Sequence, residues 1–213
     1  MAKRVLFVLI VIVAMLSIQG CNKTWSVVLN SQNSLNGWEI QDLASPYETF
    51  IFQDGLYVDG DVVHAPFGFE GDFTMEIVFD LHLDSSVLPM LQFLFSGGED
   101  AFFSKFVAST FVDINNSTEN YYIAENPPYV ALSYGNMIPG LNLDGTNTYK
   151  FVKTGSHVIV YMGDQIICDN TLTSYPYTVF FPSIYVDAAS QAQIRIKSIK
   201  VVYDGDTTVY PRP

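Results

Sequence analysis

The sequence contains few cysteines and few basic residues. Among its 213 residues there are only 2 cysteines, Cys21 and Cys168, and only 10 Lys and Arg residues against 22 Asp and Glu residues. Two cysteines are too few for the disulfide framework that stabilises many small secreted domains. The net charge of −12 repels polyanions, so we expect no nucleic acid among the partners of this protein.

Long apolar runs are also scarce, and the clearest one lies at the N-terminus. Lys3 and Arg4 precede the apolar run Val5–Leu16, and the residues Ile18 to Cys21 follow shortly after it. A basic start, an apolar stretch of about 7–15 residues and a small residue before the cleavage point are typical of a secretory signal peptide. The run is shorter than the roughly 20 apolar residues of a membrane-spanning helix.

The sequence Ile18-Gln19-Gly20-Cys21 resembles the bacterial lipobox. In that family the cysteine is lipidated at its sulfur, the peptide is cut before it, and the new amino terminus is acylated. The resemblance implies a signal peptide over residues 1–20 and a lipid bilayer as a partner through Cys21, since two or more acyl chains anchor a protein firmly. It also implies a bacterial cell envelope, with the outer membrane or cell surface favoured over the inner membrane. Gln19 is less usual than a small residue at its position, and an ordinary signal peptide cut near a cysteine is the alternative.

Cleavage would remove Lys3 and Arg4 and leave 8 basic against 22 acidic residues, a net charge of −14. So acidic a domain is repelled by anionic lipid, and the anchor must therefore supply the membrane affinity. We expect the lipidated cysteine and a spacer or first strand over residues 21–35, followed by one domain over residues 36–213, a size that is common for single β-sandwiches.

Helical periodicity is missing as well, and alternation of apolar and polar residues takes its place. The clearest example is Phe73–Leu83, where every second residue is apolar. A period of two places one set of side chains in a core and the other set toward solvent. The predicted core set is Phe73, Met75, Ile77, Phe79, Leu81 and Leu83.

Similar short runs recur along the chain and are separated by Asp-Gly, Gly-Asp and Pro-containing turn signals. The sequence His157–Asp169, with Gly163 and Asp164 at its centre, predicts a β-hairpin, and Cys168 within it is predicted to be a small buried residue rather than a nucleophile. Residues 97–148 show the weakest alternation, and we expect long loops there. Many short antiparallel strands without helices predict an all-β fold, an antiparallel two-sheet sandwich or jelly roll. The other predicted strands are Glu39–Gln41, Thr49–Gln53, Leu56–Asp59, Leu91–Ser96, Tyr129–Tyr134, Tyr149–Thr154, Ser183–Val186 and Gln193–Tyr203.

Four short segments, taken in order, resemble the concanavalin A-like lectin/glucanase jelly roll, including its laminin-G-like branch. They are Asp54–Val58, Gly71–Ile77, Tyr149–Asp169 and Ile194–Val201. The resemblance implies a concanavalin A-like sandwich over most of residues 36–203. It implies no single activity, because this fold carries lectins, glycosidases and adhesion modules.

The retaining glucanases of this fold carry a Glu-x-Asp-x-x-Glu pattern on one strand, and this pattern is missing. The nearest candidates are Glu76, Asp80 and His82, which alternation places on one face of a strand. Glu76 and Asp80 are about 13 Å apart at strand rise, whereas a retaining pair needs about 5 Å. A solvated strand face explains these residues more simply, so we expect a protein that is not an enzyme, with a glycoside hydrolase as the alternative.

No spacing of His and Cys suggests a zinc site. Calcium is conceivable because Asp59 and Asp61, and likewise Asp204 and Asp206, flank a glycine and offer oxygen ligands. Asp-Gly pairs are far more often simple turns. We therefore predict no cofactor and keep calcium as the alternative.

Aromatic residues are abundant, with 13 Tyr and 2 Trp, and several fall in expected loops. Tyr and Trp suit sugar recognition because one end of the side chain is apolar and the other polar. We therefore predict a non-catalytic, carbohydrate-binding domain whose partner is a polysaccharide or glycan, with a protein-binding adhesion or assembly module as a further alternative. The predicted ligand-binding residues are Trp38, Tyr121, Tyr122, Tyr129 and Tyr134, of which the Tyr121–Tyr122 pair is the strongest cluster.

Overall fold

The structure, a computed structural model, describes residues 22–29, 35, 37–41, 50–52, 54–58, 61–82, 90–96, 106–115, 118–125, 130–135, 138–173, 178–186 and 193–212. The predicted signal peptide and Cys21 lie outside these residues, as do Asp59, Leu83 and Tyr129. Within the described part of the chain, no helix is long and apolar enough to cross a membrane.

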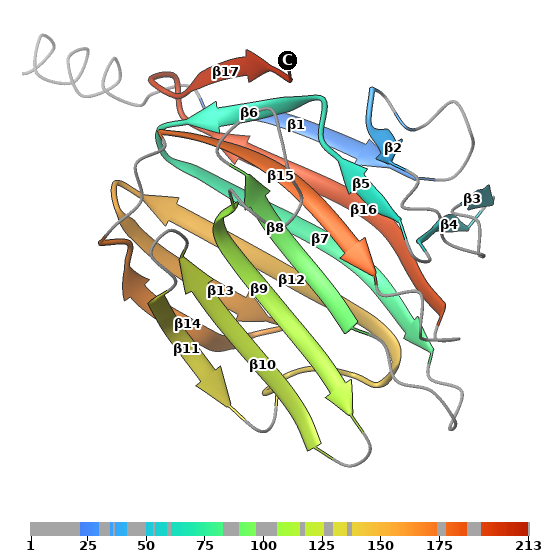
Figure 1. Cartoon of the computed structure of the whole chain (residues 1–213). Coiled ribbons are helices and arrows are strands. Elements are labelled where there is room, and N and C mark those ends of the chain that lie inside the picture. Colours follow the sequence, from blue (N-terminus) through green and yellow to red (C-terminus); the bar gives the residue numbers. More distant parts are fainter. Residues whose placement is uncertain are drawn as a thin grey trace, which may run out of the picture.

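The described strands form two stacked antiparallel layers (Figure 1). The first is an eight-stranded sheet in the order β14-β13-β12-β7-β16-β4-β3, in which β1 also pairs with β16. Its long central strands are β7 and β16, which pair along ten residues. The strands are β1 (Lys23–Val28), β3 (Phe50–Phe52), β4 (Gly55–Val58), β7 (Phe73–His82), β12 (Asp144–Thr154), β13 (His157–Met162), β14 (Gln165–Thr171) and β16 (Gln193–Tyr203).

The second is a nine-stranded sheet in the order β11-β10-β9-β8-β15-β5-β2. Strand β6 also pairs with β15, and β17 pairs with β6. The two layers confirm the predicted antiparallel sandwich. The strands are β2 (Glu39–Gln41), β5 (Val62–His64), β6 (Phe67–Glu70), β8 (Met90–Ser96), β9 (Phe106–Asn115), β10 (Thr118–Glu125), β11 (Val130–Gly135), β15 (Val179–Val186) and β17 (Thr208–Pro211).

The expectation of long loops over residues 97–148 is wrong for much of that stretch. Strands β9 and β10 lie within it, and together with β11, which corresponds to the predicted strand Tyr129–Tyr134, they form one side of the nine-stranded sheet. The sequence of β9, FVASTFVDIN, mixes small and polar residues without a period of two. Backbone pairing with β8 and β10 along the whole strand, rather than a strongly apolar face, therefore defines β9.

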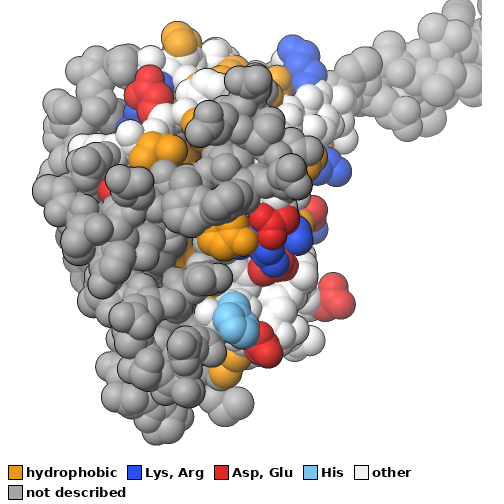
Figure 2. Space-filling model, turned by 90° about the vertical axis from the view of Figure 1, so that its right-hand side faces the viewer, with side chains coloured by type: hydrophobic (Ala, Val, Ile, Leu, Met, Phe, Trp, Pro, Cys, Tyr) orange, Lys and Arg blue, Asp and Glu red, His pale blue; other side chains and the backbone are white. Residues whose placement is uncertain are grey.

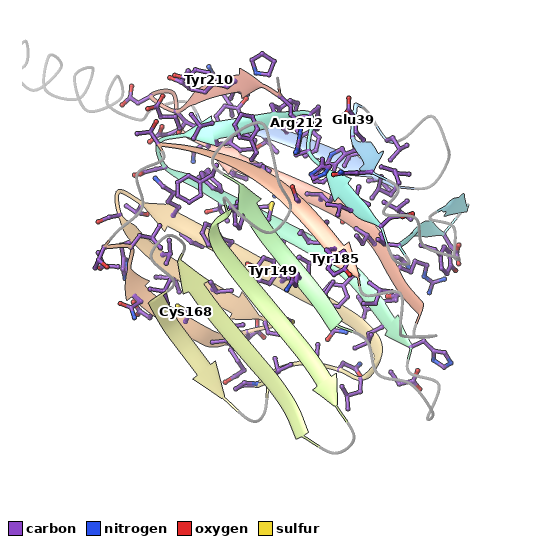
Figure 3. All side chains as sticks on the ribbon, in the orientation of Figure 1. Glu39, Tyr149, Cys168, Tyr185, Tyr210 and Arg212 are labelled. Atoms are coloured by element: carbon purple, nitrogen blue, oxygen red, sulfur yellow. The ribbon has the colours of Figure 1, made fainter. Side chains whose placement is uncertain are left out.

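The core lies between the two sheets. Along β7 the side chains alternate between buried and less buried as predicted, and Phe73, Met75, Ile77, Phe79 and Leu81 are at most 3% exposed. Aromatic rings join the layers. Phe93 of β8 stacks on Tyr149 of β12, which Figure 3 labels, with ring centroids 4.0 Å apart, and the ring centroids of Phe95 and Phe151 are 4.2 Å apart. Burial of such rings supplies most of the stabilisation of a sandwich.

Hydrogen bonds close one edge of the sandwich. Ser133 Oγ in β11 donates to the carbonyl of Ile167 in β14 at 2.7 Å, and Asn170 Nδ2 donates to the carbonyl of Leu132 at 3.0 Å. The predicted hairpin at this edge is confirmed, since β13 and β14 pair around the turn at Gly163, whose φ is 56°. These contacts tie the edge strands of the two sheets together.

The segment Lys23–Val28 is a strand rather than a loose spacer. It pairs antiparallel with β16, from Lys23 opposite Tyr203 to Val28 opposite Ser198. The chain therefore enters the eight-stranded sheet two residues after Cys21.

Candidate functional site

The outer face of the nine-stranded sheet carries a hydrogen-bonded histidine. Val63 of β5 and Ile184 of β15 belong to the core, so strand alternation places their neighbours His64 and Ser183 on the outer face. His64 Nδ1 lies 2.8 Å from Ser183 Oγ, and His64 Nε2 lies 2.8 Å from Gln41 Oε1. His64 is 8% exposed and Ser183 is 3% exposed.

The bonding of His64 fixes its protonation. The carbonyl oxygen of Gln41 can only accept, so Nε2 donates to it and Nδ1 accepts from the Ser183 hydroxyl. Burial, with a smaller contribution from the nearby Arg212 guanidinium, lowers the pKa of His64 from 6.5 to about 4. The ring is therefore neutral at physiological pH. Arg212 lies beside Glu39 near β2 (Figure 3).

A row of directly paired residues, one from each strand, crosses the same sheet from β11 to β5; we call such a row a rung. Gln92 and Tyr185 pair directly, while their chain neighbours Phe93 and Ile184 lie in the core. Residues that pair directly share one face of a sheet, so Gln92 and Tyr185 lie on the outer face. Gln92 is 9% exposed and Tyr185 is half-buried. In order, the rung is Tyr134, Tyr122, Phe111, Gln92, Tyr185 and Val62.

Two of the predicted ligand-binding tyrosines, Tyr122 and Tyr134, are thus direct backbone partners in β10 and β11. Both lie in strands, which agrees for Tyr134 with the predicted strand Tyr129–Tyr134, whereas Tyr122 was expected in a loop. Tyr121 belongs to the neighbouring rung, where it pairs with Val112 and Gly135. No sequence motif marks Gln92 and Tyr185, and only the strand register connects them with Tyr122.

Trp38 is not on a binding surface. It is 4% exposed, its ring stacks on that of Trp25 with centroids 6.0 Å apart, and it belongs to the core. A backbone hydrogen bond from Trp38 N–H to the carbonyl of Leu35 shapes the turn before β2. The prediction that Trp38 contacts a ligand is therefore wrong for this structure, because an indole packed in the core offers no face to a sugar.

The catalytic candidates lie on the other sheet. Glu76, Asp80 and His82 share the outer face of β7, as alternation predicts. Asp80 Oδ2 accepts hydrogen bonds from Arg195 Nε at 3.1 Å, Arg195 Nη2 at 2.5 Å and Lys197 Nζ at 3.1 Å, and Oδ1 accepts one from Thr146 Oγ1 at 2.6 Å.

These contacts decide the charge of Asp80. Burial alone would raise the pKa of Asp80, but the hydrogen bonds from Thr146, Lys197 and Arg195 outweigh burial and leave the pKa below its ordinary value. A carboxyl group held as an anion is unsuited to donate a proton to a leaving group. Glu76 lies between Lys150 and Lys200 in the strand register. The arrangement argues against a glycosidase centre at these residues.

Of the residues considered for calcium, Asp59 lies outside the described residues; within them, no group of three or more His, Cys, Asp or Glu side chains could hold a metal ion. Asp204 Oδ1 instead accepts from the backbone N–H groups of Asp206 and Thr207 and from Thr207 Oγ1 at 2.9–3.0 Å. This carboxylate therefore closes a turn. Asp61 is 4% exposed.

Cys168 is buried in β14, as predicted. Burial, with a smaller contribution from the neighbouring Asp169 carboxylate, raises the pKa of its thiol to about 11. Because the thiolate is the reactive form, this thiol is a poor nucleophile.

Comparison with solved structures places this architecture among lectin-like sandwiches. The carbohydrate recognition domain of Emp47p superposes with a TM-score of 0.64 at 13% sequence identity, over 85% of this chain and 95% of that one. The exoplasmic/lumenal domain of VIP36 in its Ca2+/Man3GlcNAc-bound form gives a TM-score of 0.62 at 12% identity, over 83% of this chain and 87% of that one.

A third structure is the CBM2 module of an evolved Dit protein of Lactobacillus casei BL23 phage J-1. It gives a TM-score of 0.64 at 9% identity and covers 86% of this chain and 97% of that one. No protein-family model matches the sequence, and a search of curated proteins finds no match. The similarity is thus one of fold, and the chain has the all-β, two-sheet antiparallel sandwich of the concanavalin A-like lectins.

Proposed function

We propose that the domain binds carbohydrate without catalysis, through the outer face of its nine-stranded sheet. The observation that carries the proposal is the backbone rung that runs through Tyr134, Tyr122, Phe111, Gln92 and Tyr185 on successive strands. Tyrosine rings stack on the apolar face of a sugar ring, and an amide bonds its hydroxyls. A row of such residues across a sheet matches an extended glycan better than a single small ligand.

The fold supports this choice. Among the structures of the same fold are a carbohydrate recognition domain and a domain with a bound Man3GlcNAc glycan. The state of Asp80 supports a binding role over a hydrolytic one, since its hydrogen bonds keep it ionised. Net charge supports a neutral glycan, because a chain with a charge of −12 repels strongly acidic polysaccharides.

We further propose that lipidated Cys21 anchors the domain in a bacterial envelope, at the outer membrane or cell surface. The N-terminal sequence supports this address. Strand β1 supports a short connection, because it starts at Lys23 and is paired from its first residue. The domain would then be held close to the bilayer.

A glycan array with the full chain in a non-glycosidic detergent tests the binding function. We expect neutral glycans among the hits and weaker binding by Tyr122→Ala, by about fivefold, as an aromatic contact worth roughly 1 kcal/mol implies. Tyr121→Ala, one rung away on the same strand, is the control and should keep its affinity. Equal losses in both variants, or no glycan bound, would contradict the proposal.

The anchor has its own test. Cys21→Ala should release the protein from membranes and abolish labelling with a radioactive fatty acid. Unchanged membrane retention of Cys21→Ala would contradict the anchor and leave the glycan-binding proposal intact.

A further inference from the structure

A hollow opens on the opposite side of the molecule, on the outer face of the eight-stranded sheet. It has a volume of about 270 Å³. Two successive rungs of the sheet form its floor: Thr146–Asp80–Arg195–Tyr57 and Asp144–His82. Its polar side chains thus come from β4, β7, β12 and β16, four strands that are distant in sequence and adjacent in the sheet.

The groups of the first rung are rigidly held. Arg195 donates to Asp80 on one side and, through Nη1, to Asp54 and to the Tyr57 hydroxyl on the other, the latter at 3.2 Å. The Tyr57 hydroxyl in turn donates to Asp54 at 3.3 Å. A guanidinium fixed on both sides presents its plane in one orientation, so little entropy is lost when a ligand packs against it.

The groups of the second rung remain accessible. His82 Nδ1 lies 2.6 Å from Asp144 Oδ1, and the two side chains are 68% and 80% exposed. His82 Nε2 and the second oxygen of Asp144 have no hydrogen-bond partner among the described residues. The hollow therefore has an ordered polar floor and, beside it, hydrogen-bonding groups that face solvent. Figure 2 shows this side as a compact group of acidic and basic side chains with a histidine next to an acidic side chain below it.

Charge and polarity select the class of ligand. Asp54, Asp80 and Asp144 supply one negative charge more than Arg195 and Lys197 balance, which disfavours anions. The one aliphatic residue at the hollow, Leu81, is 1% exposed and buries its side chain in the core. The described residues that line the hollow thus offer no exposed aliphatic residue to an apolar molecule, whereas paired donors and acceptors suit the hydroxyls of a neutral sugar.

We propose that this hollow is a second saccharide site, separate from the rung on the nine-stranded sheet, and that it takes one neutral hexose unit. Its volume lies just below the usual range for small-molecule pockets, about 300–1,000 Å³, so it has room for a single ring and not for a chain. The site also lies far from the start of β1. Lys23 pairs with Tyr203 at one end of β16, and Arg195 lies eight residues along that strand, about 27 Å away at strand rise.

Methyl glycosides of neutral hexoses provide the probe. The full chain, selectively labelled with 15N-glycine in a non-glycosidic detergent, reports on the hollow through the amide of Gly145, which lines it. We expect this signal to shift and saturate with at least one glycoside. His82→Ala and Asp144→Ala should weaken that binding roughly three- to tenfold, the effect of losing a hydrogen bond to the ligand.

A second exposed His–Asp pair supplies matched controls. His157 Nε2 lies 2.7 Å from Asp169 Oδ1, with side chains 46% and 56% exposed, and neither residue lines the hollow. His157→Ala and Asp169→Ala should leave the Gly145 titration unchanged. Both histidine substitutions remove exposed side chains, so both variants should fold.

Three results would overturn the proposal. The Gly145 signal could stay fixed with every glycoside, the two pairs of variants could lose affinity equally, or a methyl glucuronide could bind more tightly than the neutral glycosides. The two sites are also separable: Tyr185→Ala, on the opposite sheet, should leave the Gly145 titration intact even if it abolishes binding on the array.

Discussion

Acid should destabilise the folded protein through His64 before its carboxylates titrate. The folded ring, 8% exposed and bonded to Ser183 and Gln41, has a pKa of about 4 against 6.5 for an unperturbed histidine. Between these values the unfolded chain binds a proton that the folded chain does not. Stability therefore falls as the pH falls from about 6.5 toward 4.

The size of the effect follows from that difference. The full shift is worth about 3 kcal/mol, and roughly half of it is lost by pH 5. Because solvent reaches part of the network, we expect a loss of about 1–2 kcal/mol between pH 7 and pH 5. The carboxyl groups with lowered pKa, Asp80 and Glu70, stabilise the fold above their ordinary values of 3.8 and 4.5 and lose that contribution only below them.

Urea unfolding between pH 7 and pH 5 measures this effect. The wild type and His157→Gln, which removes an exposed histidine, should both lose stability, whereas His64→Gln should show a nearly flat profile. If His64→Gln does not fold, NMR titration of the His64 ring in the wild type replaces it, with a midpoint near 4 expected. An unchanged slope in His64→Gln, or a midpoint near 6.5, would refute the reasoning.

Three further predictions concern the core, the thiol and one turn. Phe93→Ala should destabilise the fold by about 3–5 kcal/mol, since Phe93 is fully buried and stacks on Tyr149. The control is Val209→Ala, on exposed β17, which should change stability by less than about 0.5 kcal/mol in the same urea assay. Cys168 should react with iodoacetamide only after unfolding, as mass spectrometry can follow, and rapid labelling of the native protein would contradict its burial. Gly140→Ala should lower the free energy of unfolding by about 1–3 kcal/mol, because Gly140 has a φ of 80° and a Cβ there would lie 2.3 Å from the Met162 carbonyl oxygen. Thermal melting measures this loss, with Gly205→Ala as the control, since no atom lies within 4 Å of a Cβ at that position.

Sequence patterns predicted the parts of the fold in which burial alone decides the structure. Along β7 one face packs in the core and the other faces outward, so the alternation of Phe73, Met75 and Ile77 is enough to identify the strand. The β13–β14 hairpin was equally clear, because Gly163 marks its turn. Strands β9 and β10 were missed because their pairing partners, not their own pattern, define them, whereas β11 corresponds to the predicted strand Tyr129–Tyr134.

The candidate sites depend on register, which one sequence does not reveal. Gln92 lies between Tyr185 and Phe111 only because β8 pairs with β15 and β9. Asp80 meets Arg195, 115 residues later, only because β7 pairs with β16. Trp38 was misassigned for a related reason: a tryptophan before a short strand resembles a loop residue, and only the stacking on Trp25 shows that it belongs to the core.

Glycan affinity of two tyrosine variants tests the central claim, that the nine-stranded sheet presents the main binding face. Tyr185 and Tyr161 are both half-buried and lie on the outer faces of opposite sheets. With an array-selected glycan and isothermal titration calorimetry, Tyr185→Ala should weaken binding about fivefold or more, and Tyr161→Ala should bind like the wild type. Full affinity in Tyr185→Ala together with a loss in Tyr161→Ala would place the glycan on the other sheet and contradict the account.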